Sequence, residues 1–442
     1  MTELTAGAER PLATTAHPLR EHALRVPLTN EVHARPSEAM RAPVRATVLA
    51  MLSGEAAGER ERKHLETLCD WAGVPRPAAG ATHYSGNFGS FRLKWERHTE
   101  FSTWTVYREG AFGEPFADPA LNALPRDWLA GLAGELLVGV HVAVLDADAP
   151  EPTAPQLAGI FGSDAYVGSR VAGRAATAWT DFRIHGDGFS RVLIANHSMS
   201  AWQTGRIVLR LLEIEVYRMM ALLALPAARG VLPRIGAIER ELAELTALTT
   251  DLAGLEDERG VLDKLTRLSA QTEQIAAETA YRFGAARAYY ELVERRIGEL
   301  REMRMEGLQT VGEFMDRRLT PAIRTCEAVQ GRLDTLSQRL ARASHLLRTR
   351  VEIAVEGQNA ELLRSMDRRA DLQLRLQETV EGLSVVAISY YLIGIVGYAA
   401  KSLKGVGWKV DPDLVTGLMI PVVLFLVWKG VRRIRKVLAH HG

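Results

Sequence analysis

The chain has 442 residues, a formal net charge of +1 and 24% charged residues. This length accommodates two or three domains. The near-zero net charge excludes a global basic field, so we predict no nucleic-acid partner. The two cysteines, Cys69 and Cys326, are far apart and lack metal-ligand spacing, which argues against a disulfide and a zinc site. The N-terminal segment contains no apolar stretch, so no signal peptide is expected.

Residues 1–16 are rich in Ala and Thr and aperiodic, and we expect them to be disordered. Short polar motifs then recur along the chain: HPLR at residues 17–20, NEVHARP at 30–36, FRLKWERHTEFS at 91–102, WTDFR at 179–183 and SYYLIG at 389–394. In these motifs the chain resembles an uncharacterised family of bacterial membrane-anchored proteins, the domain of unknown function 3422 (DUF3422). The resemblance extends over nearly the whole chain and implies a membrane protein, but no assigned biochemistry.

Residues 17–230 predict an α+β head domain. Apolar, β-branched or alternating runs predict strands at residues 44–52, 88–95, 101–108, 138–145, 176–185 and 191–195. Apolar residues at helical spacing predict helices at residues 59–71 and 128–138. From Ser200 the apolar period is 3.6, which predicts a longer helix with Ser200 as its N-cap and Pro226 as its stop.

Residues 231–382 are rich in Leu, Ala, Glu and Arg, and they predict a helical stalk. Helices are expected at residues 235–252 and 262–319, and Thr320-Pro321 is a typical start of a third. In the third helix, apolar residues separated largely by three or four positions form what we call the apolar seam. Its members are Leu333, Leu336, Leu340, Ala343, Leu347, Leu362, Met366, Ala370, Leu376, Val380 and Leu383. This spacing predicts a coiled coil, through which the chain would form a homo-oligomer.

The end of the chain predicts a two-helix transmembrane hairpin at residues 383–431. Residues 383–400 contain no charge over 18 positions, and residues 414–428 none over 15. A membrane-spanning helix needs roughly twenty apolar residues, and flanking Trp and Lys side chains extend both segments, so the spans are set at 383–400 and 414–431. The alternative is a pair of helices buried in a soluble core.

Residues 429–436 carry five positive charges directly behind the second span. Positive charge concentrates on the cytoplasmic side of membrane proteins. We therefore expect a basic cytoplasmic tail at residues 432–442 and an N-terminus that is also cytoplasmic. The predicted location is the bacterial inner (cytoplasmic) membrane, crossed twice.

Three groups of acidic and histidine side chains are weak candidates for binding a divalent metal. They are Glu31 with His33, Glu96 with His98 and Glu100, and Asp181 with His185 and Asp187. None has the spacing of an established metal motif, and the alternative is a network of buried ion pairs. No phosphate-binding loop or nucleophile elbow is present in the sequence either. We therefore predict no catalytic residue and no cofactor, apart from this possible metal.

Within the first span, Gly394 and Gly397 form a small-residue groove beside Tyr390 and Tyr391, which favours close helix packing over a pore-lining role. The order of parts is similar, by analogy only, to that of CorA-type magnesium channels. The corresponding place, residues 397–404, lacks their Gly-Met-Asn motif. There Lys401 would form a positive ring that repels cations.

Three functions are therefore considered, of which we prefer the first and keep the second as the main alternative. The first is a membrane-anchored structural or regulatory protein with a cytoplasmic head that self-associates through its stalk. The second is an oligomeric ion channel or transporter, which needs several chains around one axis. The third, a metal-dependent enzyme, depends on the acidic and histidine groups alone.

Overall fold

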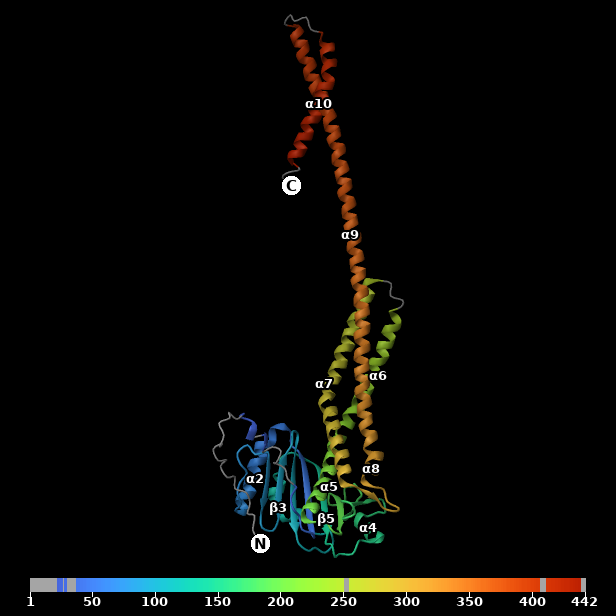
Figure 1. Ribbon diagram of the computed structural model, residues 1–442. Coiled ribbons are helices and arrows are strands. Elements are labelled where there is room, and N and C mark those ends of the chain that lie inside the picture. The colour runs from blue at the N-terminus through green and yellow to red at the C-terminus, as the bar shows by residue number, and fades with distance from the viewer. Residues whose placement is uncertain (1–21, 27, 30–36, 250–253, 406–410, 439–442) are drawn as a thin grey trace. The chain divides into compact units, whose positions relative to one another are not determined.

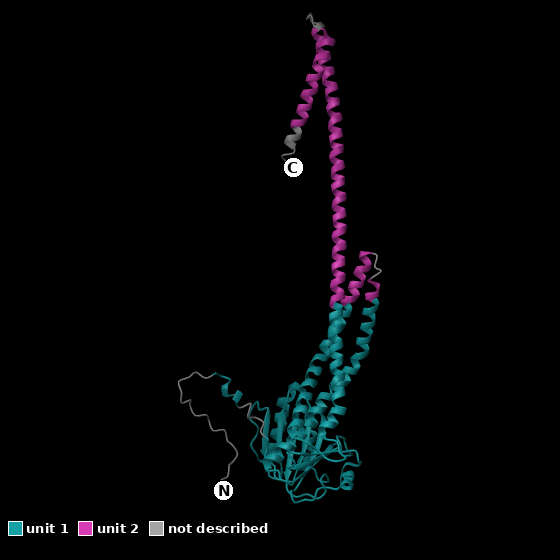
Figure 2. Ribbon diagram, turned by 45° about the vertical axis from the view of Figure 1, so that its right-hand side comes forward, with its two compact units in different colours: residues 1–244, 267–340 teal, residues 245–266, 341–442 magenta. Residues whose placement is uncertain are grey.

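The computed structural model describes residues 22–26, 28–29, 37–249, 254–405 and 411–438 (Figure 1). The chain divides into two compact units (Figure 2). The first unit lies within residues 1–244 and 267–340, and the second within residues 245–266 and 341–442. The segment expected to be disordered, residues 1–16, lies outside the described residues.

The first unit is built on a single nine-stranded sheet with the order β2-β3-β4-β1-β5-β8-β7-β6-β9. Its strands are β1 (Val44–Leu52), β2 (His83–Asn87), β3 (Arg92–Arg97), β4 (Phe101–Glu109), β5 (Glu135–Leu145), β6 (Val167–Val171), β7 (Ala176–Thr180), β8 (Ser190–Asn196) and β9 (Met303–Arg304). Neighbouring strands are antiparallel except for the parallel pair β5 and β8. The predicted β3–β4 hairpin and the central strands are confirmed, but the strand predicted at residues 176–185 ends at Thr180.

Helices cover both faces of this sheet. On one face, α2 (Gly58–Ala72) packs Leu65 and Leu68 against Trp95 and Trp104 of the β3–β4 hairpin. Farther along the same face, α4 (Ala154–Phe161) covers β5 and β8. On the other face, α5 (Ala201–Leu222) packs against β1 and β5. The alternation of side chains along each strand places these two cores on opposite faces.

The helix predicted at residues 128–138 is wrong. Helix α3 (Arg126–Ala130) is short, and the following residues enter β5 instead. Gly134 breaks the helical pattern, because its φ of 92° lies in the left-handed region. A Cβ at this position would also lie 2.6 Å from the main-chain oxygen of Leu52.

The N-cap predicted at Ser200 is confirmed, and Gln203 completes a capping box. The stop predicted at Pro226 is wrong, because α5 ends at Leu222 and α6 (Ala224–Leu248) begins before the proline. Pro226 lies in the first turn of α6, where its missing N–H leaves no intrahelical hydrogen bond unmade. Pro233, by contrast, lies inside α6.

The helix predicted at residues 262–319 is also interrupted. Helix α7 (Leu255–Leu300) is followed by β9 and then by α8 (Val311–Arg318). Arg301 has a φ of 50°, which ends the helix. Thr310 is the N-cap of α8 and forms a capping box with Glu313. The Glu302 carboxylate adds to this cap by accepting hydrogen bonds from the main-chain N–H groups of Val311 and Gly312, both at 2.9 Å.

Within the first unit, α6, α7 and α9 (Thr320–Gly405) run side by side (Figure 1). The ion pair between Arg332 and Glu239 joins α9 to α6 at 2.6 Å, and Ser337 donates to Glu273 of α7 at 3.0 Å. Leu333, Leu336 and Leu340 of the apolar seam are at most 3% exposed. This part of the seam is therefore buried within one chain.

In the second unit the side chains of the apolar seam change from buried to exposed along α9. Leu347 is still buried, and Arg350 donates to the main-chain oxygen of Thr249 at 2.9 Å. Farther along α9 the apolar side chains are exposed, including Leu362, Met366, Leu376, Val380 and Leu383. Helix α10 (Pro412–Leu438) packs against the end of α9, where Ala400 and Val423 are buried.

Candidate functional site

The first predicted metal group, Glu31 with His33, lies outside the described residues. In the second group, the Glu96 carboxylate pairs with the Lys94 ammonium at 3.0 Å. The His98 ring stacks on Phe101, with 4.2 Å between ring centroids. These two side chains therefore already have partners within the protein.

Glu100, the third member of that group, connects the β3–β4 turn to α7. Its carboxylate accepts hydrogen bonds from Arg282 at 2.6 and 3.1 Å and from the Tyr289 hydroxyl at 3.2 Å. Glu100 is 6% exposed, so this paired arrangement satisfies a buried charge. The geometry favours an ion-pair role for Glu100.

In the third group, His185 lies 3.1 Å from the Asp181 carboxylate, while Asp187 pairs with Arg191 at 3.2 Å. Partial burial raises the pKa of Asp187, but the backbone N–H of Phe189 and the Arg191 guanidinium lower it. The net result is a lowered pKa. Among the described residues, no three His, Cys, Asp or Glu side chains come together in a way that could hold a metal ion. The arrangement favours the ion-pair network.

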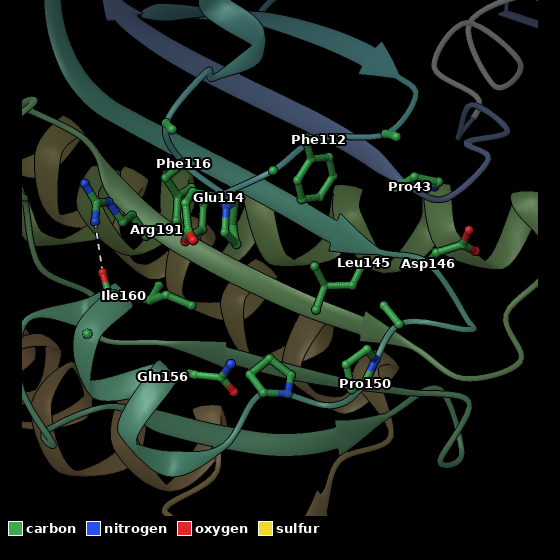
Figure 3. Close-up of a pocket in the computed structure, with 17 residues that line it drawn as sticks. Pro43, Phe112, Glu114, Phe116, Leu145, Asp146, Pro150, Gln156, Ile160 and Arg191 are labelled. Carbon is green, nitrogen blue, oxygen red and sulfur yellow. Dashed lines mark hydrogen bonds between the residues drawn. The ribbon is translucent and has the colours of Figure 1, made fainter.

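A cavity of about 800 Å³ lies beside α4 and the loop after β4 (Figure 3). Phe112, Phe116, Leu145 and Ile160 form much of its apolar lining. The guanidinium of Arg191 also faces it, but donates to the main-chain oxygen of Ile160 at 2.9 Å and lies over the Phe116 ring. The protein itself therefore binds this cation.

A second cavity, of about 780 Å³, lies between the β3–β4 hairpin and helices α5 and α7. We call it the polar cavity. Its floor contains Lys94, Glu96, Thr103 and Thr105. The strand register pairs Lys94 with Thr105 and Glu96 with Thr103, so all four side chains lie on one face of the hairpin.

Two ion pairs line the polar cavity. Lys94 and Glu96 of the floor have side chains that are 6% and 12% exposed. From the helices, Arg296 pairs with Glu213 at 2.6 Å, and these side chains are 25% and 20% exposed. Burial raises the pKa of Glu213, and Arg296 opposes that rise. Lys94 and Glu96 also act on Glu213, so the two pairs interact electrostatically.

One wall of the polar cavity is aromatic. The rings of Tyr217 and Tyr289 stack with 5.8 Å between centroids, and His98 meets Tyr217 edge-on at 6.5 Å. Burial and the charge of Glu100 raise the pKa of Tyr289. The Tyr289 hydroxyl is therefore neutral at physiological pH, and the wall offers apolar surface together with polar edges.

Sequence reasoning singled out Glu96 and His98 but missed Lys94, Glu213 and Arg296. Alternating polar and apolar residues in β3 are typical of a strand with one face in water. Only the packing of α5 and α7 over that face turns it into a cavity wall. The carboxylate on α5 and the guanidinium on α7 are 83 residues apart in the chain, and no local pattern connects them.

The helical candidates for a pore or a packing site lie in the second unit. Tyr390 and Tyr391 are 75% and 71% exposed. A Cβ added to Gly397 would lie 3.5 Å from the Thr416 hydroxyl, whereas one added to Gly394 would meet open space. Gly397 therefore permits the close approach of α10, and Lys401 is exposed.

These features define an α/β sheet domain followed by long helices, with an apolar helix at the C-terminal end. Two helices among the described residues are long and apolar enough to cross a membrane. The family model for a protein of unknown function, DUF3422, matches residues 20–438, so the chain belongs to this family. Searches of curated proteins and of solved structures found no match. The similarity to CorA-type channels therefore stays an analogy in the order of parts.

Proposed function

We propose that this protein is a membrane-anchored structural or regulatory protein of the bacterial inner membrane. Its α/β head faces the cytoplasm, and it self-associates through the exposed part of the apolar seam. The observation that supports this proposal most directly is the exposure of apolar side chains around both C-terminal helices. In the two candidate spans only 11% of residues are buried within the protein.

The exposed side chains argue against a pair of helices in a soluble core. Ile395, Leu418 and Phe425 are each more than half exposed. Soluble monomers rarely leave contiguous apolar patches larger than a few hundred Å² uncovered. Hydrocarbon covers such a surface without any protein partner, and the charged residues 429–436 would then lie at the cytoplasmic interface.

A second copy of the chain is the proposed partner of residues 355–383 of α9. Positions 362, 366, 376, 380 and 383 lie along one stripe of the helix, and all five side chains are more than 55% exposed. Steps of three or four residues separate these positions, except between 366 and 376, and such steps are typical of a coiled coil. Both copies leave the same membrane surface in the same direction, so a parallel pairing brings equivalent positions together.

Membrane anchoring is tested by alkaline extraction of membranes that contain the full-length protein. Anchoring predicts that the protein stays in the pellet, and that Leu418→Lys combined with Phe425→Lys moves it toward the supernatant. The matched control, Leu363→Lys with Leu374→Lys, changes two exposed apolar residues outside the spans and leaves the protein in the pellet. Extraction of the unchanged chain contradicts anchoring.

Self-association is tested by the mass of the purified protein in detergent, corrected for bound detergent. Replacing Leu362 and Leu376 with Ser should reduce the oligomer to a monomer. The neighbouring pair Leu363 and Leu374 has similar exposure but lies on another side of the helix, and the same change there should leave the mass unaltered. A monomeric unchanged protein would contradict the proposal.

The same measurement separates the anchored protein from the channel. A ring of several chains would favour an oligomeric channel, because two spans per chain cannot enclose a pore alone. A dimer leaves no room for one.

A further inference from the structure

We propose that the polar cavity of the head binds a small zwitterion, a molecule that carries both an ammonium group and a carboxylate. Its volume of about 780 Å³ falls within the range of small-molecule sites, roughly 300–1,000 Å³. Thr82 and Thr99 at its rim are exposed, so a ligand has a way in from solvent.

The buried polar side chains of the cavity floor are the first argument for a bound ligand. The other face of the same hairpin buries Trp95 and Trp104, as expected for a strand packed under helices. On the cavity side, Lys94 and Thr105 are each 5% exposed and Thr103 is 8% exposed. Taking charges and hydroxyls out of water costs free energy. Apolar residues of similar volume at the same positions often make the folded protein equally or more stable. Recognition of a ligand explains why charged groups line a cavity here.

The pattern of charge identifies the ligand class. Arg97 also lines the cavity, but its guanidinium pairs with Glu61 at 3.3 Å. The other charged groups form two pairs, Lys94 with Glu96 on the strand and Arg296 with Glu213 on the helices. A ligand of one sign would be attracted by one member of each pair and repelled by the other. A zwitterion has a complementary partner for both, with its carboxylate toward the cations and its ammonium toward the carboxylates.

The electrostatics of Glu213 support this assignment. Burial raises the pKa of this carboxyl group, while Lys94 on the opposite wall lowers it and Glu96 raises it. Arg296 is shared between Glu213 and Glu299, which lies 3.1 Å from it. An ammonium group in the cavity would add positive charge beside the two lining carboxylates and favour their ionised forms.

The aromatic wall gives the ligand a third contact. The stacked rings of Tyr217 and Tyr289 present apolar surface next to the charged groups. A ligand whose charged end meets the ion pairs can therefore place an aliphatic or aromatic side chain against these rings. The cavity beside α4 differs, because its cation, Arg191, pairs with Asp187, which does not line that cavity.

The test is thermal unfolding of the full-length protein in detergent, followed by tryptophan fluorescence. Trp95 and Trp104 are buried on the reverse of the cavity floor and report on the head. The probes are the proteinogenic α-amino acids, each alone, with propylamine and propionate as single-charge controls. At a concentration of about 100 Kd, binding raises the melting temperature by roughly 5–10 °C.

Variants assign any shift to this cavity. Lys94→Met and Glu213→Gln should each remove the shift, and Thr103→Val should weaken it with the least effect on folding. Gln156→Ala in the cavity beside α4 is the matched control and should keep the full shift. If Lys94→Met fails to fold, the Glu213 and Thr103 variants decide.

The proposal is overturned if no amino acid shifts the melting temperature. It is also overturned if propylamine or propionate produces the same shift as the zwitterion. A shift that persists in both Glu213→Gln and Thr103→Val places the ligand elsewhere and likewise refutes the assignment.

Discussion

His141 makes the stability of the sheet depend on pH. The side chain lies on β5, is 3% exposed and shares a hydrogen bond with the Thr47 hydroxyl at 2.9 Å. Its ring stacks on Phe189 with 4.1 Å between centroids. Burial lowers the pKa of His141 from 6.5 to about 4; Asp187 raises it and Arg191 lowers it.

The size of the effect follows from this shift. The folded pKa lies below the unfolded one, so the neutral ring contributes stability above about pH 6.5, and this contribution is lost as the pH falls toward 4. At about 1.36 kcal/mol per pKa unit, the full loss is about 3 kcal/mol. For a domain of this size that corresponds to a fall in melting temperature of roughly 6–12 °C.

The perturbation is His141→Asn, whose amide can keep the hydrogen bond to Thr47 but does not titrate. At pH 7.5 the variant should melt somewhat earlier than the parent, because the stacking on Phe189 is lost. Between pH 6.5 and 4 the parent should lose roughly 6–12 °C more than the variant. Tryptophan fluorescence of the full-length protein measures both curves. Parallel curves would refute the reasoning, because His141 would then bind no additional proton on unfolding.

Two further predictions concern the backbone of the first unit. Gly205→Ala should destabilise the protein by about 1–3 kcal/mol, because its Cβ would lie 1.7 Å from the main-chain oxygen of Glu38. A Cβ added at Gly230 in α6 would meet open space, so the control Gly230→Ala should leave the melting temperature unchanged or raise it. An equal loss of stability in the two variants would contradict the clash at Gly205. Glu302→Ala removes the hydrogen bonds to the Val311 and Gly312 amides but leaves the Thr310–Glu313 capping box. It should cost about 1 kcal/mol, with faster hydrogen exchange at these two amides of α8. The exposed neighbour Glu306→Ala should leave these amides protected, and protection in both variants would refute the capping role.

The sequence by itself determined the features that depend on local pattern. Alternation and β-branched residues located β1 and β4, and the change to a 3.6-residue period located α5 with its Ser200 cap. The uncharged run at residues 383–400 identified an apolar segment at the end of the chain. In each case the residues that decide the outcome are neighbours in the chain.

Only the tertiary structure decided where contacts between distant segments fall. Helix α7 gives way to β9 because that short strand pairs with β6, and Glu302 caps α8 only once the chain has turned back. The spacing of Leu333 is typical of an interface between chains, but this side chain is buried within one chain. The polar cavity exists because α5 and α7 cover a strand face that would otherwise be in water. Periodicity reveals which side of an element is apolar, but not which element packs against it.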